Sequence, residues 1–394
     1  MTKLRAVKSM ARICLVTHYF PPHVGGIEKV AFEQSKRLAK MGYRITVLTS
    51  KPHKEDAGSN VEGTKVLYYP TQGLVEKIGL PYPIPWLKAY PLFKTIVKKC
   101  DLVHAHGHPY PSSLLACKVA KQFKKPFIVT QHNTFIDYDS WLNLAESLND
   151  WTIGATVLKK ADKVITVSRA TKEYVLRLGA DKKKTSVIYN GVYEEFFHPM
   201  DKERCREKLS LPKNKAIILS IRRLVYKNGL NTLIEVASHL VREHHNLLFI
   251  LVGTGPDRGF IENRIKELKL SNNVKLAGFA PDEQLPYYYN AADCFVIPSS
   301  SGEGLPMVLL EAMACGLPVI STISGGTAEI IKEGVNGFLA PPRDSEALAK
   351  AILKVISSRT ASLAMGRENR RTIEKKFTWD NNMEQLKKIY KEYV

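Results

Sequence analysis

The sequence predicts an α/β protein made of two doubly wound, parallel-sheet domains that face each other across a cleft. The chain has 394 residues, which is too long for one ordinary core. Short apolar runs alternate with helical patterns along its whole length, as in parallel α/β units. The alternation also starts afresh near residue 215, after a polar and charged segment.

The first half contains six strand-like runs, each ending in polar, glycine or histidine residues. Helical patterns lie between them, most clearly at 26–42, which a glycine stops, and at 111–125. The strand-like runs are ARICLVTHYF (11–20), RITVLTS (44–50), LVHAHG (102–107), PFIVTQHN (126–133), KVITVSR (163–169) and TSVIYNG (185–191).

The second half repeats the pattern after a charged linker near 191–214 and ends in an amphipathic helix. We expect a first Rossmann-like domain at 1–195, a second at 196–375 and a C-terminal helix at 376–394 that crosses back to the first domain. In open parallel sheets, ligands bind outside the carboxyl ends of the strands. The predicted strands are KAIILSIRRL (215–224), NLLFILVGTG (246–255), NVKLAGFA (273–280), DCFVIPSS (293–300), LPVISTIS (317–324) and GFLAPPRD (337–344).

The charge is strongly basic and uneven. The formal net charge is +20, and residues 1–200 hold 30 Lys and Arg against 16 Asp and Glu. Such a charge favours anionic partners, namely phosphorylated ligands, nucleic acid or an acidic membrane surface, although solubility alone would also account for it. No apolar run reaches the roughly 20 residues of a membrane helix, and the N-terminus lacks the features of a signal peptide.

Six cysteines occur without any Cys-x-x-Cys pair, which favours free buried thiols in a reducing compartment over disulfides. We therefore expect a cytoplasmic protein, with peripheral attachment to the inner face of a membrane left open.

The stretch SSSGEGLPMVLLEAMACGLPVI (299–320) places two carboxylates around a helix start. Pro306 suits the first turn, and the exposed N–H groups of a helix start attract phosphate. Glu303 in the loop and Glu311 in the helix could accept hydrogen bonds from vicinal sugar hydroxyls. The alternative is a capped helix with two solvated acids.

Two further segments could face the same ligand. In SIRRLVYKNG, Arg222, Arg223 and Lys227 gather at a strand end and could neutralise a diphosphate leaving group, unless they form a solvated basic loop. Gly25 and Gly26 stand between the first strand and the first helix, where they either admit a phosphate or only make a tight turn. No Gly-Lys-Ser/Thr follows, so this is not a P-loop.

Histidines end two of the predicted strands. Alternation places His104 and His106 on one side of their strand, and His132 ends another. Zinc could use such a pair, but no third ligand has suitable spacing, so we expect no metal. Polar contacts of these three histidines to a sugar are the preferred interpretation.

Together, and in this order, these elements resemble the retaining glycosyltransferases of family 4, also called group 1. The resemblance extends over essentially the whole chain, through YFPPHVGGIE, DLVHAHG, VTQHN, VIYNGV, RRLVYKNG, SGGTAEII and NGFLAPPRD. Its most specific part is the Glu-x7-Glu segment with the Glu-Ala-Met-Ala-x-Gly-x-Pro-Val that follows. The resemblance implies the GT-B fold, in which two Rossmann-like domains face a cleft.

The resemblance also implies roles for individual residues. Glu303 would hold donor-sugar hydroxyls, Glu311 the ribose, and Arg223 and Lys227 the diphosphate, while His132 would contact the sugar near the bond that breaks. Catalytic roles are thus expected for His132, Glu303, Arg223 and Lys227. The remaining donor-side positions are Gly25 and Gly26 opposite the phosphates, Arg222 beside them, the backbone of Gly278 and Phe279 at the base, and the helix start at Gly304, Leu305, Pro306 and Met307.

Two departures from the family pattern leave questions open. Phe-Gly usually follows the first Glu, but here Gly304-Leu305-Pro306 follows, and proline has no N–H to donate. The basic loop usually ends in Lys-Gly, but here Asn228 precedes Gly229 and Lys227 comes one place early. Whether Arg222 or Arg223 faces the phosphates is therefore not decided by the sequence.

The implied reaction is transfer of a hexose-type sugar from a nucleoside-diphosphate sugar to a hydroxyl acceptor, with retained configuration and without a metal or other cofactor. The acceptor is a glycan, a lipid-linked sugar or a small molecule. A nucleotide-sugar epimerase or a phosphorylase of the same fold is the nearer alternative. A nucleic-acid-binding protein is the more distant one, and no basic motif interleaved with aromatic residues supports it.

The segment LVEKIGLPYPIPWLKAYPLFKTIVKKC (74–100) mixes aromatic, apolar and proline residues and ends in lysines. Its two interpretations are contact with an anionic membrane or a lipid-linked acceptor, and an ordinary helical hairpin packed on the sheet.

Overall fold

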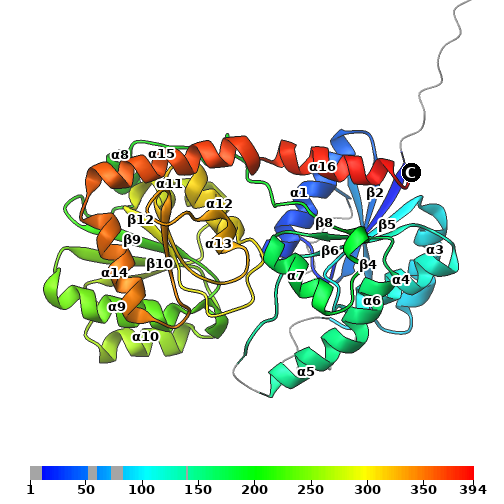
Figure 1. The fold of residues 1–394 in the computed structure, drawn as a ribbon, viewed down its shortest axis with the longest axis horizontal. Coiled ribbons are helices and arrows are strands. Elements are labelled where there is room, and N and C mark those ends of the chain that lie inside the picture. The colour runs from blue at the N-terminus through cyan, green and yellow to red at the C-terminus, as the bar shows by residue number, and fades with distance from the viewer. Residues whose placement is uncertain (1–10, 52–59, 72–82, 139–140) are drawn as a thin grey trace, which may run out of the picture.

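The computed structural model describes residues 11–51, 60–71, 83–138 and 141–394, and contains two parallel sheets flanked by helices (Figure 1). Alternate residues of the central strands enter different cores, because side chains of a strand point to opposite faces. Ile13 and Leu15 of β1 lie in one apolar cluster, and Cys14 and Val16 lie in the other. The predicted architecture of two doubly wound domains is confirmed.

The first sheet has the strand order β3-β4-β2-β1-β5-β6-β7-β8. All neighbours are parallel except the short hairpin of β3 and β4, which the sequence analysis did not predict. The strand order reverses between β1 and β5, which is where ligands bind in open parallel sheets. Because the strands are parallel, the loops that follow β1, β5 and β6 lie at the same edge of the sheet. The strands are β1 (Arg12–Val16), β2 (Arg44–Ser50), β3 (Asn60–Val61), β4 (Thr64–Tyr69), β5 (Leu102–His106), β6 (Phe127–Gln131), β7 (Lys163–Thr166) and β8 (Thr185–Val187).

The helices of this half pack on the two faces of the first sheet. One helical run is interrupted by a π-helical turn, η1 (Asp150–Gly154), which joins α5 directly to α6. The helices are α1 (Gly26–Lys40), α3 (Ala89–Lys99), α4 (Pro111–Gln122), α5 (Leu142–Asn149), α6 (Ala155–Lys160) and α7 (Arg169–Arg177), with a 3-10 turn η2 (Lys182–Lys184).

The second sheet has the order β11-β10-β9-β12-β13-β14 and is entirely parallel. Its order reverses between β9 and β12, which lie side by side, so the loops that follow these two strands are neighbours. The basic loop and the Glu303 loop are those two loops. The strands are β9 (Ala216–Ile221), β10 (Leu247–Val252), β11 (Val274–Gly278), β12 (Cys294–Ile297), β13 (Val319–Thr322) and β14 (Gly337–Ala340).

Part of the linker expected near 191–214 is folded and packs on the second domain. It contains α8 (Lys202–Lys208), where the Arg206 side chain is buried and pairs with Asp293 at 2.8 Å. A buried and paired guanidinium fixes this segment on the second domain. The other helices of this half are α9 (Leu230–Glu243), α10 (Arg258–Glu267), α11 (Leu285–Ala291), α12 (Met307–Ala314), α13 (Thr327–Ile330), α14 (Ser345–Ile356) and α15 (Arg359–Lys376), with 3-10 turns η3 (Tyr226–Asn228) and η4 (Asp282–Gln284).

The chain ends in α16 (Trp379–Lys391), which follows α15 along one edge of the molecule from the second domain to the first (Figure 1). The hydroxyl of Tyr390, which is fully buried, lies 2.6 Å from Nδ1 of His104 in β5. Gln34 of α1 donates to Asn382 at 3.1 Å. The final helix therefore packs on the first sheet.

The segment 74–100 is described only from residue 83 onward, so the membrane prediction for its first part lies outside the described residues. In α3, Ala89, Phe93 and Val97 are buried in the core of the first domain, as a packed helix requires. Across the described ranges, none of the helices has the length and apolar character that crossing a bilayer demands. All six cysteines are buried and unpaired, as predicted.

Candidate functional site

Glu303 lies in the loop that follows β12 and is held from two sides. Its Oε1 accepts a hydrogen bond from Ser299 Oγ at 2.7 Å and pairs with Nη2 of Arg222. Its side chain is only 10% exposed. Burial alone would raise the pKa of Glu303, but Arg222 and Lys227 outweigh burial and lower it. The carboxylate is therefore ionised and oriented before any ligand arrives.

The basic loop after β9 is fastened to the Glu303 loop. The Ser300 amide donates to the carbonyl of Lys227 at 2.9 Å. Gly229 has φ +67°, and a Cβ there would overlap the carbonyl oxygen of Pro298, so glycine is required. Burial lowers the pKa of Lys227, although Glu303 opposes this effect. The amine thus lies within electrostatic reach of the Glu303 carboxylate.

The two arginines of the basic loop differ in position. The side chain of Arg222 is 8% exposed and contacts Glu303 and, at 3.1 Å, Oδ1 of Asn228. Arg223 is exposed, and its carbonyl accepts from Nδ2 of Asn228 at 2.7 Å. Asn228, which departs from the family pattern, therefore holds the side chain of Arg222 and the backbone of Arg223.

Glu311 lies in α12, one turn after the helix start. Pro306 is the N-cap residue, so the helix begins at Met307, one place later than the sequence suggested. Oε2 of Glu311 accepts from the hydroxyl of Tyr289 at 2.9 Å, and Oε1 pairs with Nζ of Lys29 at 2.8 Å. The residue is 1% exposed. Each oxygen of its carboxylate thus has one donor, and the two donors come from different domains.

Lys29 comes from α1 of the first domain and was not predicted. Its amine also lies 3.6 Å from Asp282, and these carboxylates raise its pKa against the opposing effect of burial. It borders a cavity of about 540 Å³ between the domains, which Glu311, Asp282, Phe197 and Trp379 also line. A lysine on an amphipathic helix ordinarily indicates solvent exposure, so the sequence held no signal for this role.

Gly25 is the N-cap residue of α1, and Gly26 is its first residue. A Cβ at residue 25 would overlap the buried carboxylate of Glu28, whereas a Cβ at residue 26 would meet no atom within 4 Å. Glu28 pairs with Nδ1 of His23 at 3.0 Å. Gly25 thus makes room for an acid, and Gly26 leaves the helix start open.

The histidines form a stacked row at the carboxyl edge of the first sheet. Nδ1 of His106 lies 2.9 Å from Nε2 of His132, with ring centroids 5.1 Å apart. Burial lowers the pKa of His106 to about 3 and that of His132 well below its usual range. Both rings are therefore neutral at pH 7. One of the two facing nitrogens, Nδ1 of His106 or Nε2 of His132, carries the proton of the hydrogen bond between them.

His104 belongs to the same row, and both of its ring nitrogens are engaged. It is fully buried, and Thr130 Oγ1 at 2.7 Å and Tyr390 hydroxyl at 2.6 Å occupy its two ring nitrogens. Through Tyr390 this residue holds α16 on the sheet. Its contact with a sugar stays a prediction.

The loop after β6 brings His132 against the second domain. A Cβ at residue 304 would overlap the carbonyl oxygen of His132, so only glycine permits the approach. Thr134 Oγ1 donates to the carbonyl of Glu303 at 3.1 Å, and the Asp137 amide donates to Ser301 Oγ at 2.9 Å. The structure thus brings His132, Glu303 and Gly304 together from two domains.

Of the other predicted residues, Leu305 adjoins this contact, whereas Gly278 and Phe279 lie at the end of β11. Leu305 is buried, and its carbonyl accepts from Asn190 Nδ2 at 3.0 Å. Gly278 ends β11 with φ +75°, and Phe279 beyond it is 59% exposed. Within the described ranges, no hydrogen bond or ion pair joins Phe279 to Glu303 or Glu311.

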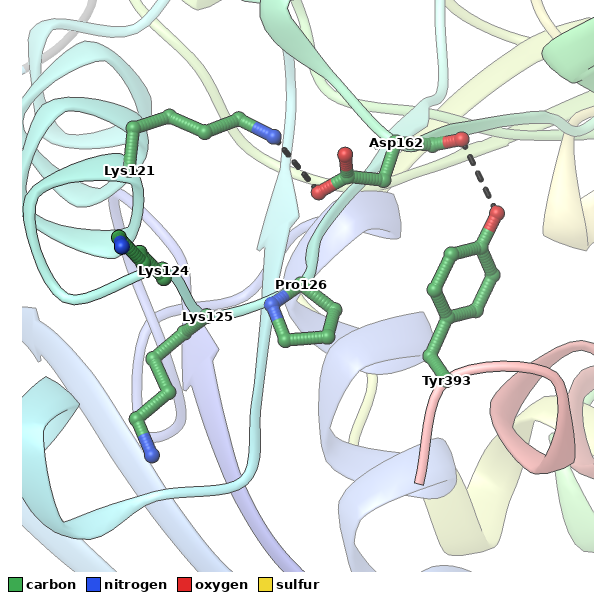
Figure 2. A pocket seen from close by; sticks show the side chains of 6 residues that line it. All are labelled: Lys121, Lys124, Lys125, Pro126, Asp162 and Tyr393. Atoms are coloured by element: carbon green, nitrogen blue, oxygen red, sulfur yellow. Dashed lines mark hydrogen bonds and ion pairs between the residues drawn. The ribbon is translucent and has the colours of Figure 1, made fainter.

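A second hollow lies at the opposite, amino-terminal edge of the first sheet (Figure 2). Lys121 Nζ contacts Asp162 at 2.7 Å, and the Tyr393 hydroxyl donates to the carbonyl of Asp162 at 3.0 Å. Since donor-side loops follow the carboxyl ends of strands, this hollow is separate from the Glu303 contact. Its lining residues are Lys121, Lys124, Lys125, Pro126, Asp162 and Tyr393.

Two family models match the two halves of the chain: Glycosyltransferase Family 4 at residues 24–196 and Glycosyl transferases group 1 at residues 201–372. An uncharacterized glycosyltransferase of Methanocaldococcus jannaschii is 26% identical over 97% of this chain and 99% of its own length. The gpi3 subunit of phosphatidylinositol N-acetylglucosaminyltransferase from Schizosaccharomyces pombe is 27% identical over 95% of this chain and 79% of its own.

Among solved structures, Anabaena HepE in complex with UDP-glucose superposes with a TM-score of 0.80 at 21% identity. The match covers 97% of this chain and 100% of that one, and it shows likeness of fold. Since both halves match their family models in order and relatives align over nearly the whole length, this chain belongs to the family 4, group 1 glycosyltransferases of GT-B fold.

Proposed function

We propose that this glycosyltransferase moves a hexose-type sugar from a nucleoside-diphosphate sugar to a hydroxyl acceptor, with retention of configuration and without a metal ion. One observation carries the proposal: where the two domains touch, the loop of Glu303, whose carboxylate has Arg222 and Lys227 nearby, abuts the backbone of His132. Preorganised acid, cations and imidazole at a domain contact suit an uncharged sugar joined to a charged leaving group.

The residues divide into two groups around the bond that breaks. Glu303, already ionised and oriented by Arg222, would accept hydrogen bonds from sugar hydroxyls. Lys227 and the exposed Arg223 would receive the diphosphate, since Arg222 is already engaged by Glu303. Glu311 would exchange Lys29 for ribose hydroxyls.

The reaction needs no second carboxylate at the anomeric carbon. The acceptor hydroxyl would attack that carbon on the face from which the diphosphate leaves. The bond from the anomeric carbon to the phosphate oxygen breaks, the new glycosidic bond forms, and the hydroxyl proton passes to the departing phosphate oxygen. A neutral His132 beside the sugar would position it without adding positive charge.

UDP-hexoses are the first donors to test. The structural neighbour from Anabaena is described in complex with UDP-glucose, and the S. pombe relative is named as an N-acetylglucosaminyltransferase acting on phosphatidylinositol. Thermal shift with UDP, UDP-glucose and UDP-N-acetylglucosamine would identify a ligand, because binding to the native state raises the melting temperature.

The site assignment is tested by three substitutions once a donor is known. Glu303→Ala, Lys227→Ala and Glu311→Ala should each lower transfer by about 10²-fold, the usual loss for one preorganised charge contact. Nuclear magnetic resonance of the product should show a retained anomeric configuration and a new linkage. A changed sugar without acceptor would indicate an epimerase, and near-normal turnover of all three variants would reject the site.

A further inference from the structure

The helical run from α5 through η1 carries a stripe of large apolar side chains in solvent. Trp141, Leu144, Leu148 and Trp151 are 70%, 76%, 63% and 61% exposed. They recur every three or four residues, which places them on one face of a helix. None of the residues of α5 is buried, and Figure 1 shows the helix projecting from the first domain on the side opposite α16.

The stripe contains no exposed acid. Between Trp141 and Lys160 the exposed residues are the four of the stripe, Thr152, Lys159 and Lys160. The acids of this run face inward: Asp150 is buried beside His108 and Tyr174, and Glu146 is half-buried. The outer face therefore combines tryptophans, leucines, lysines and one threonine, in a half of the chain with 30 basic against 16 acidic residues.

The base of α5 is tied to the donor-side contact. Asn143 Nδ2 donates to Asp137 at 2.7 Å, and its Oδ1 accepts from the Tyr138 amide at 2.7 Å. Asp137 in turn contacts Ser301 and Arg343 of the second domain. Burial and the neighbouring Asp150 raise the pKa of Glu146 to about 7, while the charge of Lys227 opposes them. The inner face of α5 thus looks toward the basic loop, and the outer face carries the stripe.

We propose that the stripe is a membrane-docking surface that seats the enzyme on an anionic lipid bilayer, where it meets an acceptor anchored in that bilayer. Tryptophan prefers the interface between lipid and water, and leucines between two such residues would enter the acyl boundary. Lys159 and Lys160 would lie near the headgroups, where each basic residue adds attraction to anionic lipid. The acceptor part of this proposal rests on the proposed function.

A second copy of the chain fits the stripe less well. A stable interface buries about 800 Å² on each partner, spread over 20–30 residues. The two tryptophans supply about 300–500 Å², since a large aromatic side chain buries 150–250 Å². With the two leucines the stripe has four side chains, far fewer than the 20–30 residues of such an interface. An amphipathic segment lying on a bilayer needs only a few such side chains plus basic charge.

Vesicle co-sedimentation at low salt tests the proposal, using phosphatidylcholine vesicles with and without phosphatidylglycerol. The wild-type chain should bind the anionic vesicles, and Leu144→Gln/Trp151→Ser should bind them at least tenfold more weakly. The matched control Leu363→Gln/Phe260→Ser removes one leucine and one aromatic side chain that are 55% and 59% exposed elsewhere, and should bind like wild type. Lys159→Glu/Lys160→Glu should weaken binding to anionic vesicles only.

Three results would overturn the docking surface. They are absence of vesicle binding, equal binding by the stripe and control variants, and a concentration-dependent dimer that the stripe variant abolishes. UDP affinity, measured by calorimetry on the same proteins, should be equal in the stripe variant and wild type, which also shows that the variant is folded. Vesicle binding without any nucleotide binding would leave the docking surface standing and reject the proposed function instead.

Discussion

The amine of Lys29 lies 2.8 Å from the carboxylate of Glu311, so a cation of the first domain holds an acid of the second, 282 residues away. The side chain of Glu311 is 2% exposed, and that of Lys29 is 29% exposed. A buried carboxylate that loses its charged partner bears the full desolvation cost. The pair therefore links the stability of the chain to contact between its domains.

Lys29→Met should lower the free energy of unfolding by about 1–3 kcal/mol, because Glu311 keeps only the Tyr289 hydroxyl. Urea denaturation measures the change. Lys36→Met is the control: it removes an ion pair to Glu62, which is 47% exposed, and exposed pairs contribute about 0–1 kcal/mol. Equal effects of the two substitutions would contradict the assigned role of Lys29.

Substitutions of the two neighbouring arginines should have different effects, one on the rate of transfer and the other on UDP binding. Arg222→Met should lower kcat by about 10²-fold, because it releases the Glu303 carboxylate that Arg222 orients. Arg223→Met should mainly weaken UDP binding, since its side chain is exposed and not engaged by Glu303. Calorimetry with UDP and steady-state kinetics distinguish the two, and a reversed pattern would assign the phosphates to Arg222.

The sequence predicted the fold and most of the donor-side loops because these depend on local patterns. Strand ends, glycines and acids are visible within a few residues, and the parallel topology brings strand ends to one edge. The adjacency of the loops after β9 and β12 follows from strand order alone. Strand β3 was missed because two residues have no measurable periodicity, and the six-residue strand β4 was missed with it.

Contacts between distant residues could not be predicted. Lys29 resembles a solvated helix residue until Glu311 is placed opposite it. The partner of His104 could not be predicted either, because Tyr390, which occupies one of its ring nitrogens, comes 286 residues later. The difference between Arg222 and Arg223 depends on which way each side chain points as the strand ends. The order of the two arginines in the sequence does not say which side chain points toward Glu303.

The neutral histidines predict how stability depends on pH. Unfolded histidine binds a proton below about pH 6.5, whereas His106, with a pKa of about 3, and His132 stay neutral in the folded chain. The unfolded state then binds more protons, so stability is complete above pH 6.5 and falls as the pH drops toward 3. Each site contributes a slope of about 1.4 kcal/mol per pH unit.

Urea denaturation between pH 7.5 and pH 5 measures this slope. His106→Gln removes one of the histidines whose pKa folding lowers, without adding a charge, so the slope should become smaller by about one proton. An unchanged slope would mean that His106 does not stay neutral on folding.

Because Gly304 lies against His132, we expect sugar transfer to depend on the absence of a Cβ at residue 304. The Cβ of alanine at residue 304 would overlap the carbonyl oxygen of His132, and since the Cβ is fixed to its own backbone and the oxygen belongs to backbone, the domains must move apart. A displacement of about 1 Å commonly costs 10²-fold in rate, so Gly304→Ala should lower transfer by that order. Gly259→Ala is the control, because a Cβ there meets no atom within 4 Å and alanine favours the helix α10. Full activity of Gly304→Ala would show that transfer does not require the two domains to close as they do here.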